Sequence, residues 1–269
     1  MLAAKRKELI QTILSERQNI TTKELLNLLP TSRTTLYRDL LALQKENFLQ
    51  MHNGTVSLKF QSSPHSFCPG SLQQTSPSNL PQLHAIAATA ASIISATDSI
   101  FIGEGVVCHL LACKIRELDY LKNITVVTNN FNVALELNGF IKHIYLIGGE
   151  LHQNPNSLYT GGPRLEENLR TIYVSKAFAN VDGVDVKAGY TMKELSQLSI
   201  LSHLSSFSSE SVFLIPSNRF GYCSVHHLGT LEQADKIITD NHLSEKNRST
   251  FLTLHRPELV IACSPDSEC

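Results

Sequence analysis

The stretch that decides the fold of the N-terminal part is SRTTLYRDLLALQKEN, residues 32–47. Within it Leu36, Leu40 and Leu43 recur at helical spacing, so they form one apolar stripe along an amphipathic helix. Ser32 precedes the stripe and belongs to the residue types that cap helix N-termini. The stretch therefore predicts a helix that buries its leucine face and exposes the opposite one.

Shorter signals on both sides complete a small domain. Apolar spacing predicts a first helix over residues 5–15. Thr21 and Glu24 have capping-box spacing at the start of a second helix, which Pro30 ends because a proline disfavours the α conformation in the residue before it. Residues 48–51 and 56–58 flank the turn HNGT, residues 52–55, and predict a hairpin. Residues 1–60 are thus predicted to form a winged helix-turn-helix domain.

The exposed face of the third helix carries Arg33, Thr34, Tyr37 and Arg38. The first turns of a recognition helix enter the major groove, where arginine pairs with guanine and threonine meets a thymine methyl group. Residues 1–60 also hold nine Lys and Arg against five Asp and Glu, whereas the rest of the chain is net negative. The same residues would also suit an ordinary solvated face, but the ordered elements and the local charge favour DNA binding.

Two motifs of this domain resemble the DNA-binding domain of the DeoR family of bacterial transcription regulators. TSRTTLYRDL, residues 31–40, is similar to the family's V-S-x-x-T-I-R-R-D-L, and HNG, residues 52–54, to its H-G-G. Tyr37 stands where the family usually has an arginine, which should change the operator sequence that is read without removing DNA binding. The candidate DNA-binding residues are Lys23, Ser32, Arg33, Thr34, Thr35, Tyr37, Arg38, Lys45, His52 and Asn53.

A stretch without formal charge follows, from residue 60 to residue 97. Residues 61–80 are rich in Ser, Pro and Gln, which predicts a flexible linker. Residues 82–96 return to a helical pattern of Ala and Ile. Because a helix without charge on any face is usually buried, we expect it to pack against the C-terminal domain or against a partner subunit, in preference to an independent linker helix.

Residues 81–269 alternate between apolar runs of strand length and helical stretches, which indicates an α/β domain with a mostly parallel sheet. The predicted strands are residues 99–102, 124–128, 143–147, 172–178, 211–215, 236–239 and 258–262. The predicted helices between most of them are residues 106–118, 130–137, 163–170, 193–205 and 243–253. Ligands of such sheets bind at the carboxyl ends of the strands, so the residues that follow each strand are candidates for a binding site.

Several motifs at these positions resemble the DeoR sensor domain, a Rossmann-like α/β domain similar to ribose-5-phosphate isomerase. They are TNN at 128–130, IGGE at 147–150, GGP at 161–163, KAFANVDGVD at 176–185 and SNRFG at 217–221. Together with the two motifs of residues 1–60, these motifs extend over nearly the whole chain, with gaps, and occur in the same order as in the family. The candidate effector-binding residues are Gly103, Glu104, Gly105, Asn129, Asn130, Gly148, Gly149, Glu150, Lys176, Asp182, Gly183, Ser217 and Arg219.

The loop after the first predicted strand departs from the family. It reads GEGVV, residues 103–107, where the family commonly has D-S-G-T-T, a loop that can hold a phosphate at a helix N-terminus. The backbone amides remain, but Val106 and Val107 lack hydroxyls and Glu104 would repel an anion unless its side chain points away. Pro216 likewise replaces the usual Asp before SNRFG. The sequence leaves open a closed loop without a ligand and an effector site with a weakened grip on phosphate.

Other classes of protein are disfavoured. The chain has neither a run of eighteen apolar residues nor a secretory signal, and its six cysteines form no C-x-x-C pair. We therefore expect a cytoplasmic protein with reduced thiols. Neither Cys108-His109 nor His226-His227 has a metal-ligand spacing such as H-x-x-x-H, so we expect structural histidines, no metal site and no cofactor.

The resemblance implies a sequence-specific repressor of a carbohydrate uptake or catabolism operon, relieved by a sugar-phosphate-like effector. Its partners would be double-stranded operator DNA, that effector and further copies of itself, as a dimer or tetramer. A sugar-phosphate isomerase-like enzyme is one alternative, with Lys176, Asp182, Asp185 and Lys193 as acid/base groups. We expect no enzyme, since a fold does not supply chemistry and no complete catalytic set is present. A body that only oligomerises is the other alternative.

Overall fold

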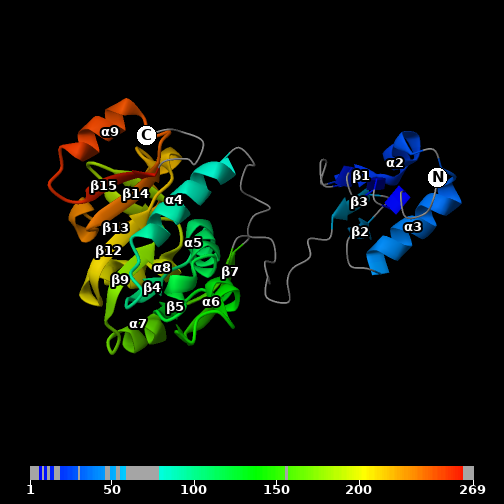
Figure 1. Cartoon of the computed structure of the whole chain (residues 1–269). Helices are drawn as coiled ribbons and strands as arrows, with labels where there is room; N and C mark the ends of the chain where they lie inside the picture. Colours follow the sequence, from blue (N-terminus) through cyan, green and yellow to red (C-terminus); the bar gives the residue numbers. More distant parts are fainter. Residues whose placement is uncertain are drawn as a thin grey trace. The chain divides into compact units, whose positions relative to one another are not determined.

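The computed structural model describes residues 6–7, 9–10, 13–14, 19–29, 31–45, 49–52, 55–58, 79–154 and 157–262. The chain divides into two compact units, residues 1–64 and residues 65–269, here called the head and the body (Figure 1). Nearly all of the predicted linker, residues 61–80, lies outside the described residues. Among the described residues, no helix combines the length and apolar character needed to cross a membrane.

The head has the predicted helices and hairpin. Its described helices are α2, Thr22–Leu28, and α3, Arg33–Lys45, and the described parts of residues 6–14 are also helical. A three-stranded antiparallel sheet has the order β1-β3-β2, with β1 at Asn19–Thr21, β2 at Leu49–His52 and β3 at Thr55–Leu58. Strand β1 was not predicted, because three residues are too few to show an alternating pattern.

Helices α2 and α3 start at the caps that the sequence indicated. The backbone amide of Glu24 donates to Thr21 Oγ1 at 3.2 Å, and the Thr21 amide donates back to Glu24 Oε2 at 2.9 Å, which completes the capping box. The amide of Thr35 donates to Ser32 Oγ at 3.3 Å and so caps α3. Local hydrogen bonds therefore fix where α2 and α3 begin.

The leucine stripe of α3 is the centre of the head's core. Leu36, Leu40 and Leu43 are at most 1% exposed and pack with apolar side chains of the other elements of the head. Beside this core, Arg6 Nε lies 2.7 Å from Asp39 Oδ2, and the two side chains are only 13% and 7% exposed. This ion pair joins the first helical segment to α3.

A seven-stranded parallel sheet forms the centre of the body, in the order β15-β14-β12-β9-β4-β5-β6. All seven predicted strands are present: β4 at Ser99–Ile102, β5 at Thr125–Thr128, β6 at His143–Leu146, β9 at Val174–Ala179, β12 at Ser208–Leu214, β14 at Lys236–Asp240 and β15 at Glu258–Ala262. From β4 the chain adds β5 and β6 on one side and then returns to place β9 on the other. The topological switch point of the sheet therefore lies between β4 and β9.

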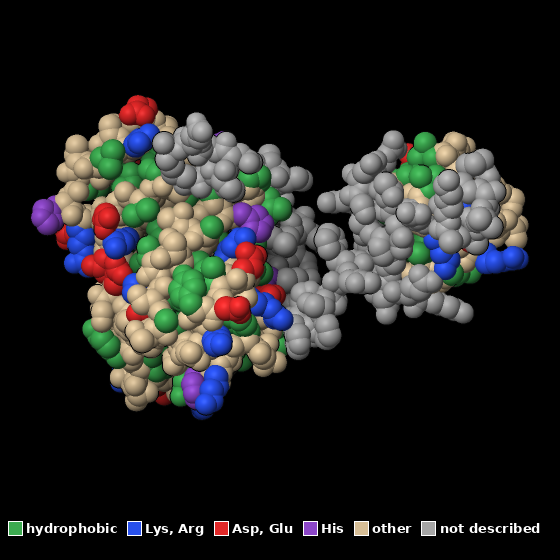
Figure 2. Space-filling model, in the orientation of Figure 1, with side chains coloured by type: hydrophobic (Ala, Val, Ile, Leu, Met, Phe, Trp, Pro, Cys, Tyr) green, Lys and Arg blue, Asp and Glu red, His purple; other side chains and the backbone are tan. Residues whose placement is uncertain are grey.

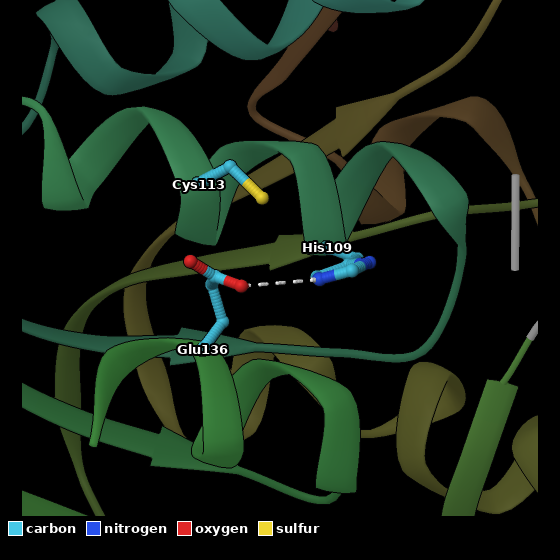
Figure 3. A group of neighbouring side chains, drawn as sticks. All are labelled: His109, Cys113 and Glu136. Carbon is cyan, nitrogen blue, oxygen red and sulfur yellow. Dashed lines mark ion pairs between the residues drawn. The ribbon is translucent and has the colours of Figure 1, made fainter. Parts of the chain in front are cut away.

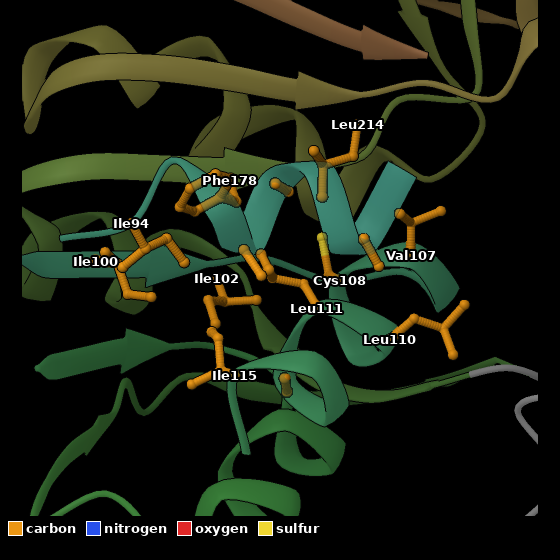
Figure 4. Packing of buried hydrophobic residues seen from close by; sticks show 14 of the residues in the cluster. Ile94, Ile100, Ile102, Val107, Cys108, Leu110, Leu111, Ile115, Phe178 and Leu214 are labelled. Carbon is orange, nitrogen blue, oxygen red and sulfur yellow. The ribbon is translucent and has the colours of Figure 1, made fainter. Parts of the chain in front are cut away.

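Helices cover both faces of this sheet (Figure 1). The α-helices are α4 at Leu80–Ser92, α5 at Val106–Arg116, α6 at Phe131–Leu137, α7 at Pro163–Leu169, α8 at Leu195–Ser202 and α9 at Glu245–Leu252, and short 3-10 helices span Asp119–Leu121, Leu204–Ser206, Ser217–Arg219 and Leu231–Gln233. Helices α4 to α6 contribute to one hydrophobic cluster (Figure 4), and α7 to α9 to another. In β4, Ile100 and Ile102 belong to the first cluster and Phe101 to the second, as alternation along a strand requires.

The charge-free helix packs against the body, which is one of the two placements expected for it. Helix α4 buries Leu83, Ile86, Ala87 and Ala90 and contacts α5 and the strands β14 and β15. It ends at Ser92 and not at residue 96. The lack of charge in this stretch is therefore explained by burial.

Two small sheets in the body were not predicted. One is a hairpin of β7, Glu150–Asn154, and β8, Ser157–Gly161. The other is an antiparallel sheet of β10, Gly183–Asp185, β11, Gly189–Met192, and β13, His226–Gly229. The sequence of β7, ELHQN, is largely polar and exposed, so it lacks the apolar pattern by which strands are recognised.

Candidate DNA-binding surface and effector site

The solvent-facing side of α3 is basic and open. The side chains of Arg33, Thr34 and Arg38 are exposed, and Leu41 is 50% exposed. A shallow hollow of about 730 Å³ runs along this side, lined by Arg33, Thr34, Tyr37, Arg38, Leu41 and Ala42. The residues expected to read DNA thus share one accessible surface, opposite the buried leucines.

Tyr37 is tied to its neighbours on this surface. Its hydroxyl is hydrogen-bonded to the side chains of Thr22 and Arg33, and these bonds lower the pKa of Tyr37 below its usual value. The guanidinium carbon of Arg33 lies 5.8 Å from the centre of the tyrosine ring. Tyr37 therefore links α2 to α3 and positions Arg33, in addition to any contact of its own with DNA.

The remaining candidate DNA-binding residues have different surroundings. Lys23 is exposed in the first turn of α2. Ser32 and Thr35 are hydrogen-bonded to each other, with their hydroxyl oxygens 2.8 Å apart. Asn53 and the side chains of Lys45 and His52 lie outside the described residues.

In the body, three loops meet at the switch point of the sheet. The amide of Gly103, after β4, donates to the carbonyl of Phe178 in β9 at 2.9 Å, and Asn130 Nδ2, after β5, donates to Gly103 O at 3.4 Å. Gly105 has a φ of 125°, and a Cβ there would lie 3.0 Å from Cβ of Asn180 after β9. These contacts place Gly103, Gly105 and Asn130 together at the carboxyl edge, where the sequence predicted a ligand site.

Glu104 lies within this site and not away from it. Asn154 Nδ2, from the hairpin of β7 and β8, donates to Glu104 Oε1 at 3.0 Å. Burial raises the pKa of Glu104 to about 7, with smaller contributions from the nearby carboxylates of Asp182 and Glu194 and an opposing one from the hydrogen bond of Asn154. Val107, which stands at one of the family's threonine positions, is buried in the hydrophobic cluster (Figure 4).

The raised pKa of Glu104 predicts a pH dependence of stability. Between about 4.5, its ordinary pKa, and about 7, the folded protein keeps a proton that the unfolded chain releases, so this group's contribution to stability falls as the pH rises through that window and is constant above it. From pH 5.5 to pH 8 the loss is about 2 kcal/mol. Urea unfolding of the wild type and Glu104→Gln at both pH values measures it: the difference in unfolding free energy between the two proteins should change with pH. A pH-independent difference would contradict the placement of the carboxyl.

Polar side chains of β8 and α8, which the sequence did not single out, complete the rim of the candidate effector site around the predicted residue Asn129. Asn129 Nδ2 donates to the carbonyl of Thr160 at 2.8 Å and to Gln197 Oε1 at 3.4 Å. Asn129 Oδ1 and Gln197 Nε2 are buried without a hydrogen-bond partner among the described residues. The hydroxyl oxygens of Tyr159 and Ser196 lie 3.1 Å apart. Tyr159 and Thr160 come from β8, and Ser196 and Gln197 come from α8; no local motif marks any of the four.

Other candidate effector-binding residues are placed around this rim. Gly148, Gly149 and Glu150 are exposed at the end of β6 and the start of β7. Asp182 Oδ2 accepts a hydrogen bond from the backbone amide of Lys193 at 2.8 Å. Gly183 is closely packed, since a Cβ there would lie 2.3 Å from the carbonyl oxygen of Tyr222. The amide of Ser217 donates to Asp240 Oδ2 at 2.7 Å, and Arg219 is exposed to solvent.

Lys176 is not brought to the candidate effector site. Its Nζ lies 2.7 Å from Asp98 Oδ2, and Asp98 immediately precedes β4. The pair therefore lies at the amino end of the strands, at the edge opposite the rim. Lys176 lies in the first half of β9, so its side chain is upstream of the loop that carries Asp182.

A group with metal-ligand chemistry is also present. His109 and Cys113 of α5 and Glu136 of α6 have ligand atoms that all lie within 4.8 Å of one another (Figure 3). No metal site was expected from the sequence, because neither Cys108-His109 nor His226-His227 has a metal-ligand spacing such as H-x-x-x-H. The spacing H-x-x-x-C at residues 109–113 was the signal that would have drawn attention to this group.

The surface of the body is mixed in charge. On the face that Figure 2 shows, acidic and basic side chains are interspersed over the described part of the body. A surface of that kind produces no strong field of one sign. The basic outer side of α3 is therefore the better match to a polyanion.

Both the head and the body match models of known protein families. Residues 6–61 match the model of the DeoR-like helix-turn-helix domain, and residues 78–241 match that of the DeoR C terminal sensor domain. The Lactose phosphotransferase system repressor of Lactococcus lactis subsp. lactis is 30% identical over 92% of this chain and 94% of its own. The HTH-type transcriptional repressor GlcR of Bacillus subtilis (strain 168) is 28% identical over 86% of each chain.

Solved structures show only a slight likeness. Ribose 5-phosphate isomerase from Plasmodium falciparum is 15% identical, with a TM-score of 0.36 over 53% of each chain. The family matches, in contrast, extend over most of the chain and concern regulators and not enzymes. The helix-turn-helix domain implies DNA binding and the sensor domain implies binding of an effector. From its two domains and its relatives, the chain belongs to the DeoR family of transcriptional regulators.

Proposed function

We propose that this protein is a cytoplasmic, sequence-specific repressor of a carbohydrate uptake or catabolism operon, relieved by a sugar-phosphate-like effector. The observation that carries the proposal is the outer side of α3, where Arg33, Thr34 and Arg38 are exposed on a helix whose other side forms the core. Two relatives whose names describe repressors, one of a lactose phosphotransferase system, support the link to sugars.

Repression requires two heads and a link to the effector. Operators of helix-turn-helix proteins consist of half-sites spaced by whole turns of DNA, so the active form is a homo-oligomer, a dimer or a tetramer. The effector must bind more tightly to the arrangement that cannot hold both half-sites. Its free energy of binding then shifts the population away from the DNA-bound form.

The effector site in this proposal is the rim at the switch point. The loops after β4, β5 and β9 supply backbone groups. Asn129 Oδ1 and Gln197 Nε2, which have no hydrogen-bond partner in the part of the chain that the structure describes, supply hydrogen-bonding capacity. Glu104 weakens the grip on a phosphate group, because it brings a carboxyl group into the loop that precedes α5. A body that only oligomerises remains the alternative, and it predicts no response to sugars of any kind.

The test begins with genome-wide mapping of the bound DNA, which supplies the operator. Operator affinity is then measured with a panel of sugar phosphates and unphosphorylated sugars for the wild type, Glu104→Gln and Glu104→Ser. Removing the charge should lower the concentration of sugar phosphate needed for release by on the order of tenfold, and more so with serine, whose hydroxyl can also bind phosphate. The same operator affinity under all conditions in all three proteins would support the oligomerisation alternative.

A further inference from the structure

Three side chains of different chemistry converge between α5 and α6 (Figure 3). His109 and Cys113 are four residues apart on α5 and therefore share one side of the helix. Glu136 faces them from α6, with its Oε2 atom 3.8 Å from His109 Nε2. The ligand atoms of all three lie within 4.8 Å of one another.

We propose that His109, Cys113 and Glu136 bind one Zn²⁺ ion, with the fourth position taken by water. Imidazole nitrogen, thiolate sulfur and carboxylate oxygen are the three protein ligands of zinc, and a set of three leaves one position open. Bonds of about 2.0–2.3 Å in tetrahedral geometry separate neighbouring ligand atoms by about 3.3–3.7 Å. The His109–Glu136 distance already approaches this range, and small side-chain rotations bring Cys113 Sγ within it.

The surroundings favour a formed site in preference to a chance encounter on the surface. His109 is 3% exposed and the Glu136 side chain 13%, and α5 is anchored by the hydrophobic cluster on its other side (Figure 4). Arg116 Nη1 donates to the backbone carbonyl of Glu136 at 2.7 Å and lies 3.8 Å from Glu136 Oε1. It thereby holds the carboxylate with Oε2 toward His109, as outer-shell partners of metal ligands do.

Arg116 should also affect how tightly the site binds Zn²⁺. The positive charge of Arg116 opposes a second cation nearby, so the affinity should be below that of structural sites with four protein ligands. Binding also releases the proton of the Cys113 thiol to solvent, because the thiolate is the ligand. Affinity for zinc should therefore increase as the pH rises.

The proposed zinc site lies close to the candidate effector site along α5. The backbone amide of His109 donates to the carbonyl of Gly105 at 3.1 Å, so the proposed ligand is one helical turn from the loop that contains Glu104. A metal ion between α5 and α6 would fix the helix from which that loop departs. The zinc proposal itself does not depend on the nature of the effector or on DNA binding.

The experiment uses the full-length protein, reduced, stripped with a chelator and dialysed. Zn²⁺ titration followed by elemental analysis should give one ion per chain, and Co²⁺ should produce the tetrahedral absorption bands together with a sulfur-to-cobalt charge-transfer band. Cys113→Ser should abolish the charge-transfer band, and His109→Gln and Glu136→Gln should each weaken zinc binding at least tenfold. Zinc should raise the Tm of the wild type, since it binds the folded state.

Matched controls separate this site from adventitious binding by other thiols and imidazoles. Cys223→Ser and His227→Gln each remove an exposed residue of the same type elsewhere in the body and should leave stoichiometry and affinity unchanged. Circular dichroism of the metal-free variants establishes that they are folded. No binding in the wild type, or a charge-transfer band that persists in Cys113→Ser, would show that the three side chains form only a polar contact between helices and would overturn the proposal.

Discussion

Replacing Arg33 and Arg38 together by alanine is expected to weaken operator binding by on the order of a hundredfold or more. Both side chains are exposed on the outer side of α3, and each guanidinium that pairs with a guanine contributes about 1–3 kcal/mol. The fold should be unaffected, because the core of the head is made by the opposite side of the helix. Fluorescence anisotropy with labelled operator at fixed salt concentration measures the loss.

Single variants separate the contributions of Arg33 and Arg38 to operator affinity. Arg38→Ala tests base reading alone, whereas Arg33→Ala also releases Tyr37, whose hydroxyl is hydrogen-bonded to Arg33. Arg248→Ala, at an exposed arginine of α9, removes the same charge from the body and should leave operator affinity unchanged. If Arg38→Ala bound the operator as tightly as the wild type, the assignment of α3 as the recognition helix would be wrong.

Asp39→Ala is expected to destabilise the head by about 2–4 kcal/mol. The aspartate is 5% exposed and lies between buried leucines on α3, so its carboxylate serves the fold and not the DNA-facing side. Its loss leaves the guanidinium of Arg6, only 13% exposed, without its ion pair at 2.7 Å. Removing one partner of a buried pair costs more than removing both, because the remaining charge is left desolvated.

Hydrogen exchange of the α3 amides measures this change, because exchange reports opening of the head separately from the body. Exchange should be faster in Asp39→Ala, and the double variant Arg6→Met with Asp39→Leu should restore much of the protection by replacing the ion pair with apolar contact. Equal protection in the wild type and Asp39→Ala would mean that the pair is not formed in solution.

The strongly patterned elements could be predicted from the sequence. The seven strands of the main sheet are apolar runs because most of them are covered on both faces, and the leucine stripe of α3 is equally regular. The hairpin of β7 and β8 could not be predicted in this way. Strand β7 is mostly exposed and largely polar, so it lacks an alternation of apolar and polar residues.

The candidate effector site could be predicted only in part. Strand order brings together the loops that contain Gly103 and Asn130, and a parallel sheet implies this from the sequence alone. Asn154 and Gln197 join them through β7 and α8, which depends on tertiary packing that no local pattern encodes. Lys176 was misplaced because it shares a motif with Asp182, although three further residues of β9 follow it, about 10 Å of extended chain.

The separate hydrophobic clusters bear on how the protein denatures. Among the described residues of the head, ten buried apolar side chains pack together, whereas the two clusters of the body share one sheet and should melt with it. Calorimetry should consequently resolve two heat-capacity peaks instead of a single two-state transition. Any ligand held by the body would raise the temperature of one peak and leave the other in place, so a melting curve reports which domain a compound binds.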